Sequence, residues 1–102
     1  MAITNLIERL ESEWSLEEGF LGLLREGRFS DDGLSRLLNL LDEIEPSESE
    51  FIERRLVELL WYMPIFMRWQ KERLQENGVN LEKLSSAITE VENRLEAALG
   101  VP

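Results

Sequence analysis

Residues 56–70 read LVELLWYMPIFMRWQ, and this stretch decides how the middle of the chain folds. Its apolar side chains recur with the 3.6-residue period of an α-helix, but they fall on two opposite faces of that helix. One face predicts an ordinary core stripe, made of Ile52, Leu56, Leu59, Leu60, Met63, Phe66, Met67 and Leu74. The opposite face carries Val57, Trp61 and Ile65, with Tyr62 and Trp69 on its flank.

This second apolar face has two explanations, and the residues alone leave both open. In the first, the helix is the centre of a bundle and shorter helices cover both of its sides, because a helix that is apolar all round is usually buried. In the second, the Trp61 face lies outside and anchors a partner, because Trp and Tyr are enriched among the residues that dominate binding energy. The burial of Trp61 in the folded protein distinguishes the two.

Pro64 lies inside this stretch and limits how the helix continues. Proline lacks the backbone N–H that would bond to the Leu60 carbonyl, and its ring clashes with the preceding turn. A straight helix from Ser47 to Asn77 would be about 45 Å long at about 1.5 Å per residue, which is too long for its neighbours. The sequence therefore predicts one long helix that is kinked at the proline and ends at Gly78.

The rest of the chain also has helical patterns and almost no strand pattern. The further predicted helices cover about residues 3–13, 16–27, 31–44 and 81–98. Their expected N-caps are Ser15, Ser30 or Asp31, and Asn80. Together these features predict an all-α single domain over residues 1–102, a bundle of about five helices with a long, proline-kinked fourth helix.

Two glycines, Gly19 and Gly22, lie inside the second predicted helix. Each weakens a helix by about 1 kcal/mol relative to alanine. We interpret them as positions of close backbone approach or local irregularity, in preference to a ligand-binding loop.

Composition excludes several classes of protein. Hydrophobic residues make up 43% and charged residues 31% of the 102 residues, which is typical of a globular domain. The chain has no Cys and no His, so thiol nucleophiles, Ser-His-Asp machinery and the usual zinc sites are absent. We therefore expect no catalytic residue, no cofactor and no metal. No apolar run approaches the ~20 residues of a membrane helix, so a cytoplasmic protein is expected.

The net charge of −10 limits the partners further. An acidic chain is repelled by phosphate backbones and anionic lipid, so we expect neither direct nucleic-acid binding nor membrane binding. Six acids with no base among them lie between residues 42 and 53: Asp42, Glu43, Glu45, Glu48, Glu50 and Glu53. They form either a solvated face near a helix start or an electrostatic patch that steers a basic partner.

The segment Glu58-Leu59-Leu60-Trp61-Tyr62-Met63-Pro64 resembles the acid-x-x-Tyr-Tyr-Pro motif of the small acidic immunity proteins that bind bacteriocin nucleases. The resemblance implies a helical protein whose paired aromatic residues anchor a basic enzyme. Here the Tyr pair is Trp-Tyr, the proline is displaced by one residue, and the aromatic helix is long where the family's is short. The similarity is therefore one of charge and size, not of family membership.

The leading hypothesis is a small acidic helical module that binds and neutralises a basic protein, in the manner of an immunity protein, antitoxin or inhibitor. Its predicted partner-binding residues are Trp61, Tyr62, Ile65, Trp69 and Glu58, with the six acids of residues 42–53. One alternative is a structural protein that forms homodimers through the Trp61 face or through the seam of Leu81, Leu84, Ile88, Val91, Leu95 and Ala98. Another is an acidic mimic of nucleic acid that occupies a basic groove.

Overall fold

The chain forms seven helical segments and no strand within residues 3–45 and 51–102, which are the residues that this computed structural model describes. They are α1 (Ile3–Glu13), α2 (Phe20–Arg25), α3 (Asp31–Asp42), α4 (Arg54–Trp61), α5 (Met63–Trp69), α6 (Lys71–Glu76) and α7 (Leu81–Leu99). The predicted all-α fold is confirmed over these residues, but the predicted number of about five helices is too small.

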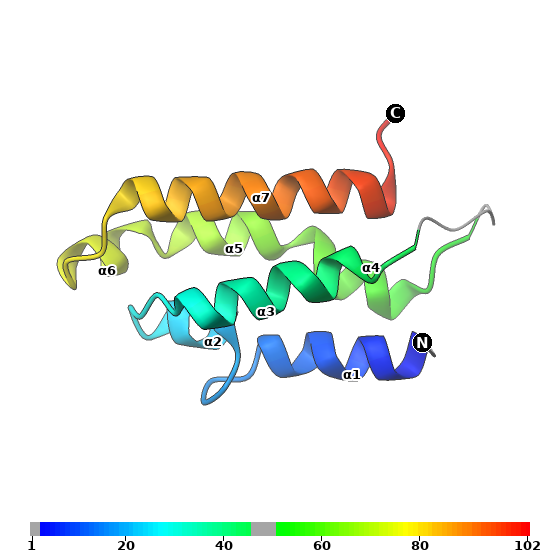
Figure 1. Cartoon of the computed structure of the whole chain (residues 1–102), viewed down its shortest axis with the longest axis horizontal. Helices are drawn as coiled ribbons and strands as arrows, with labels where there is room; N and C mark the ends of the chain where they lie inside the picture. The colour runs from blue at the N-terminus through cyan, green and yellow to red at the C-terminus, as the bar shows by residue number, and fades with distance from the viewer. Residues whose placement is uncertain (1–2, 46–50) are drawn as a thin grey trace.

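Four rows of helix run along the long axis of a body of 44 × 29 × 19 Å (Figure 1). The rows are α1, α3, the succession α4–α5–α6, and α7, and the chain reverses direction from each row to the next (Figure 1). Helix α3 packs against α1 and α7, and the α4–α5 row packs against the same two helices. The segment from residue 43 to residue 53 therefore joins rows that lie diagonally across the bundle.

The fourth predicted helix is not one helix, so the prediction of a long, proline-kinked helix is wrong. Residues 54–76 form three short helices with single-residue junctions at Tyr62 and Gln70. Pro64 lies in the first turn of α5, where its missing N–H costs no hydrogen bond. The Leu60 carbonyl accepts the backbone N–H of Tyr62, the residue that ends α4. The proline thus starts a new helix instead of bending an existing one.

Side chains bond to backbone carbonyls at both junctions. The indole N–H of Trp14, on the neighbouring row, donates to the Leu59 carbonyl at 3.1 Å. At the second junction, the backbone N–H of Gln70 bonds to Met67 at 3.2 Å, and its side-chain amide donates to Phe66, also at 3.2 Å. These bonds satisfy carbonyls close to the breaks, which lowers the cost of interrupting the helix.

The core stripe predicted for this region is confirmed with one exception. The buried members are Leu56, Leu59, Leu60, Met63, Phe66, Met67 and Leu74. Ile52 is partly exposed because it lies before α4 begins, so its predicted place in the core is wrong. No helix of the described residues covers the opposite side of the row, where Trp61 and Trp69 are exposed, so the interpretation as a central helix wrapped on both sides is also wrong.

Helix α2 is shorter than predicted and packs unusually closely. It begins at Phe20, and Leu16 lies in a turn before it with half of its surface exposed. A Cβ on Gly22 would lie only 1.7 Å from the carbonyl oxygen of Ser15, and one on Gly19 would lie 2.1 Å from a carbonyl oxygen of α1. The interpretation of these glycines as points of close backbone approach is confirmed.

Three of the predicted helix ends are confirmed by their hydrogen bonds or dihedral angles. The Ser30 hydroxyl accepts the backbone N–H of Gly33 at 2.9 Å, and the Asn80 side chain accepts that of Glu82 at 2.8 Å. Gly78 has φ of +81°, a left-handed conformation that glycine adopts at low cost, and it ends α6.

The apolar seam of α7 faces inward. Leu84, Ile88, Val91 and Leu95 are buried, and α7 packs against α3, α5 and α6. The seam therefore packs within the chain, which leaves the Trp61 face as the surface for the homodimer alternative.

Candidate functional site

Three aromatic side chains meet on the outside of the α4–α5 row, and we call Trp61, Tyr62 and Trp69 the aromatic surface. The Tyr62 ring contacts the Trp61 ring at a centroid distance of 5.4 Å and the Trp69 ring at 5.6 Å, both edge to face. Trp61 is 54% exposed and Trp69 is 68% exposed, while Tyr62 is half-buried between them. Such edge-to-face contacts hold large apolar rings in a defined arrangement on a surface.

A second layer of aromatic rings supports Tyr62 from inside. The Trp14 ring stacks on Tyr62 at 6.4 Å and meets the buried Phe66 ring edge-on at 5.0 Å. The Arg25 guanidinium lies 5.2 Å from the Phe66 centroid. Because the Trp14 indole also bonds to Leu59, this layer ties α1 to the junction from which the aromatic surface projects.

Trp14 is a residue of this site that sequence reasoning missed. Trp14 is the last apolar residue of the helical stripe that begins at Ile3, and its position in that stripe predicts only that the side chain is buried. Its indole N–H needs a hydrogen-bond acceptor when buried, and this was the one available signal of a longer-range role. No sequence pattern identifies the junction carbonyl as that acceptor.

Two shallow grooves border the aromatic surface. One lies between the α4–α5 row and the end of α7, has a volume of about 280 Å³, and is lined by Trp61, Pro64, Glu92, Leu95, Glu96, Leu99 and Gly100. We call it the α7 groove. The other has a volume of about 350 Å³ and is lined by Glu11, Trp14, Arg25, Arg55, Glu58, Leu59 and Tyr62. Both grooves combine apolar side chains with acids, and the second groove also contains two arginines.

The acids beside the aromatic surface are mostly not the ones predicted. Of the predicted acids that the structure describes, only Glu58 lines either groove. It pairs with Arg54 at 3.7 Å and with Arg55 at 3.4 Å, and Arg55 also pairs with Glu11 at 2.7 Å. The other groove acids, on α1 and α7, are far from Trp61 in sequence, and only the packing of the bundle brings them near it.

The acidic run of residues 42–53 is partly neutralised by arginines of the chain itself. Asp42 pairs with Arg94 of α7 at 3.0 Å, and Glu43 pairs with Arg9 of α1 at 2.7 Å. The hydrogen bonds and positive charge of Arg9 hold the pKa of Glu43 below its ordinary value. These two acids therefore join α3 to other helices.

The remaining acids of the run that the structure describes, Glu45 and Glu53, lie at the end of the bundle, away from the aromatic surface. Glu45 and Glu53 line a small hollow of about 140 Å³ with Phe51 and Ile52. No ion pair within the described ranges involves Glu45 or Glu53. The predicted contributions of Glu48 and Glu50 lie outside the described residues. Ile65, the last predicted apolar residue of the site, is half-buried on α5.

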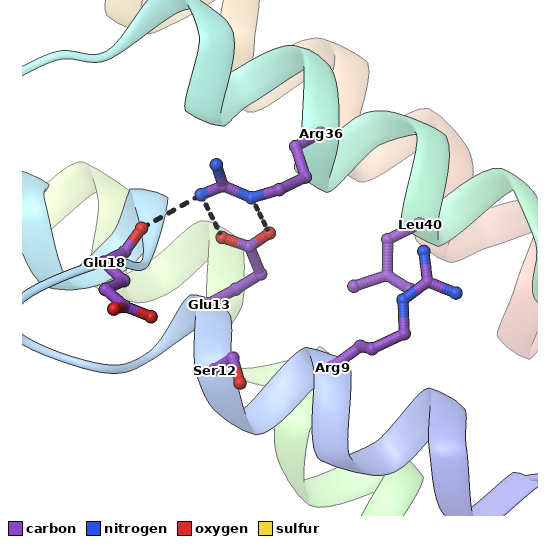
Figure 2. A pocket seen from close by; sticks show the side chains of 6 residues that line it. All are labelled: Arg9, Ser12, Glu13, Glu18, Arg36 and Leu40. Atoms are coloured by element: carbon purple, nitrogen blue, oxygen red, sulfur yellow. Dashed lines mark hydrogen bonds and ion pairs between the residues drawn. The ribbon is translucent and has the colours of Figure 1, made fainter.

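A further hollow, of about 450 Å³ between α1 and α3, holds a buried carboxylate (Figure 2). Glu13 is 3% exposed and accepts two bonds from Arg36, at 2.8 and 2.9 Å, and a third from the backbone N–H of Phe20 at 3.1 Å. Figure 2 shows Arg36 reaching from α3 to Glu13 and to the backbone of Glu18. These bonds raise the pKa of Arg36, and because each polar group is satisfied within the network, its role is to join α1, α2 and α3.

Acrylamide quenching of tryptophan fluorescence tests the exposure of the aromatic surface. We expect Trp61→Phe and Trp69→Phe each to remove an easily quenched component with emission at longer wavelength. The double variant retains only Trp14, which is half-buried and hydrogen-bonded, so its quenching should be severalfold weaker and its emission shifted to the blue. Trp14→Phe is the matched control and should leave quenching strong. Equal quenching of all four proteins would contradict this geometry.

The described parts of the chain were also compared with the requirements of a membrane span and of a metal site. They contain no helix that is long and apolar enough to cross a membrane. They also contain no group of three or more side chains placed to hold a metal ion. Comparisons of this chain with protein-family models, with curated proteins and with solved structures found no match.

Proposed function

We propose that this chain is a cytoplasmic, non-catalytic module that binds and neutralises a basic protein, in the manner of an immunity protein, antitoxin or inhibitor. The aromatic surface is its anchor. One observation carries the proposal: two tryptophans, more than half exposed, are held in fixed contact with one tyrosine on the outside of the bundle. Trp and Tyr are the residues most enriched at the energetic centres of protein interfaces.

The support beneath the aromatic surface favours a binding role. Trp14 stacks on Tyr62 from inside and is itself held by Phe66, so the outer rings lose little conformational freedom when a partner covers them. A preorganised surface of this kind retains more of its contact energy on binding, because ordering of side chains opposes association. Exposed aromatic rings without such support would contribute less free energy to association, because they would have to be ordered on binding.

Charge indicates the kind of partner. The chain carries a net charge of −10, and the α7 groove includes the acids Glu92 and Glu96. The second groove contains Glu11 and Glu58, but Arg25 and Arg55 line it as well. A basic protein is attracted by this field, and its association is accelerated at low ionic strength. A second copy of the chain is repelled by the same field, so a basic partner is preferred over a homodimer at the aromatic surface.

Affinity capture with matched variants tests the proposal. The wild-type protein is compared with the Trp61→Ala/Trp69→Ala double variant and with Leu16→Ala, a control that removes an apolar side chain of similar exposure elsewhere. We expect wild type and Leu16→Ala to retain a basic protein whose activity they inhibit. The double variant should bind the purified partner roughly 100-fold or more weakly in calorimetry, because each hot-spot tryptophan contributes about 2 kcal/mol or more.

Two other results would contradict the proposal. If the double variant binds and inhibits the partner as well as wild type, and binding weakens steeply with salt, the nucleic-acid mimic is the better explanation. If wild type sediments as a dimer at micromolar concentration and the double variant as a monomer, the aromatic surface is a homodimer interface. Circular dichroism of each variant confirms that the helices remain folded.

A further inference from the structure

The α7 groove combines three features that favour a positive charge. Its wall is the half-exposed indole of Trp61, its floor includes Pro64, Leu95 and Leu99, and Glu96 stands at its edge. An aromatic face attracts a cation through its quadrupole, and an apolar floor accepts the methylene stem of a long basic side chain. The groove thus matches both parts of such a side chain.

The end of α7 adds to the negative potential. The last carbonyls of a helix carry a partial negative charge, which basic residues in the last turn usually offset. The last turn of α7 has no basic residue and instead carries the acid Glu96. The backbone N–H of Gly100 bonds to the Glu96 carbonyl at 2.9 Å and is the cap bond at this end. An acid at this position is unfavourable for the helix alone, and an external cation would relieve it.

The two groove acids differ in their partners. Glu92 pairs with Arg68 at 2.9 Å, so its charge is already balanced. No ion pair among the described residues involves Glu96. Glu96 is therefore the carboxylate of the groove that remains available to a cation from outside.

We propose that the α7 groove receives an arginine side chain of the basic partner, an inference that rests on the proposed function. The guanidinium stacks on Trp61 and donates to the Glu96 carboxylate, and its stem lies along Leu95 and Leu99. Arginine fits better than lysine because its planar group both stacks on an indole and presents several donors to a carboxylate and to neighbouring carbonyls. The groove then supplies specificity next to the apolar contact of the aromatic surface.

Titration with Nα-acetyl-arginine amide, followed by two-dimensional NMR, tests the assignment without a partner. The neutral isostere Nα-acetyl-citrulline amide is the control probe, and the Trp61 indole resonance is assigned with Trp61→Phe. Glu96→Gln tests the contribution of the carboxylate, and Trp61→Leu tests that of the indole ring. Glu76→Gln is the matched control, because Glu76 is an exposed acid on α6, at the opposite end of the molecule (Figure 1).

We expect the arginine probe to shift the Trp61 indole and Glu96 resonances saturably. Glu96→Gln and Trp61→Leu should each weaken this binding about threefold or more, as expected for an exposed ion pair or cation–π contact, and Glu76→Gln should leave it unchanged. The assignment is overturned if the citrulline probe produces the same shifts. It is also overturned if Glu76→Gln weakens binding as much as Glu96→Gln, which would indicate general attraction to an acidic protein.

The same variants separate this inference from the proposed function. If binding of the partner depends on Trp61 and Trp69 but is as tight to Glu96→Gln as to wild type, the proposed function is supported and the arginine site is contradicted. If the arginine probe binds as expected but capture of the basic protein does not depend on the two tryptophans, the arginine site is supported and the proposed function is contradicted.

Discussion

Gly22→Ala is expected to destabilise the fold by roughly 3 kcal/mol or more, measured as the free energy of unfolding in urea. The added Cβ would lie 1.7 Å from the Ser15 carbonyl oxygen and 2.8 Å from the Leu16 Cα. These are backbone atoms, so no side-chain rotation relieves the clash, and the turn before α2 must move. Helix propensity alone gives the opposite sign, because alanine is the better helix former by about 1 kcal/mol.

The control for this prediction is Gly78→Ala. Gly78 has φ of +81°, but a Cβ there would meet no atom within 4 Å. The expected cost is therefore only that of a left-handed non-glycine residue, roughly 1–2 kcal/mol. A Gly22→Ala protein as stable as wild type would show that α2 does not approach the preceding turn as closely as described.

Arg36→Met is expected to cost about 2–3 kcal/mol of stability, because it leaves a buried carboxylate without its main partner. Glu13 accepts both bonds of the Arg36 fork and otherwise has only the Phe20 backbone N–H (Figure 2). The Arg36 side chain is itself about half exposed, at 52%, so the expected loss is smaller than for a fully buried pair. Chemical denaturation of the variant measures this loss.

Two further variants separate the ion pair from general effects of losing an arginine. Arg54→Met removes a partner of Glu58 that is 92% exposed at a distance of 3.7 Å, and it should change stability by less than about 0.5 kcal/mol. Adding Glu13→Leu to Arg36→Met removes the orphaned charge, so the double variant should be more stable than Arg36→Met alone. If Arg36→Met and Arg54→Met are equally mild, the Glu13 carboxylate is solvated and the network is not structural.

Local signals in the sequence were sufficient for three of the seven described helices. The periods of 3 and 4 predicted α1, α3 and α7, and the caps at Ser30, Asn80 and Gly78 predicted where helices begin or end. These features depend on residues within one or two turns of each other, so the chain's own spacing specifies them. The same spacing predicted the core stripe from Leu56 to Leu74, because burial follows helical period.

The sequence also contained the residues of the aromatic surface, but it did not specify their exposure. Trp61 and Trp69 fit a helix covered on both sides as well as a helix covered on one side. Tertiary packing decided between the two, because α1 and α7 flank the α4–α5 row and no described helix covers its outer face. Pro64 makes a break near Tyr62 predictable, but the hydrogen bond from the Trp14 indole to the Leu59 carbonyl beside that break depends on the packing of another row.

By itself, therefore, the sequence determined an acidic, helical chain, the helix ends at Ser30, Gly78 and Asn80, and the apolar stripe that faces inward. The tertiary structure alone decided that Trp61 borders Glu96, that arginines of α1 and α7 neutralise Glu43 and Asp42, and that Gly22 approaches a backbone. The physical reason is the sequence distance over which each interaction acts. Helical period and capping act over four or five residues, whereas the neighbours of an exposed ring or charge depend on how separate helices pack.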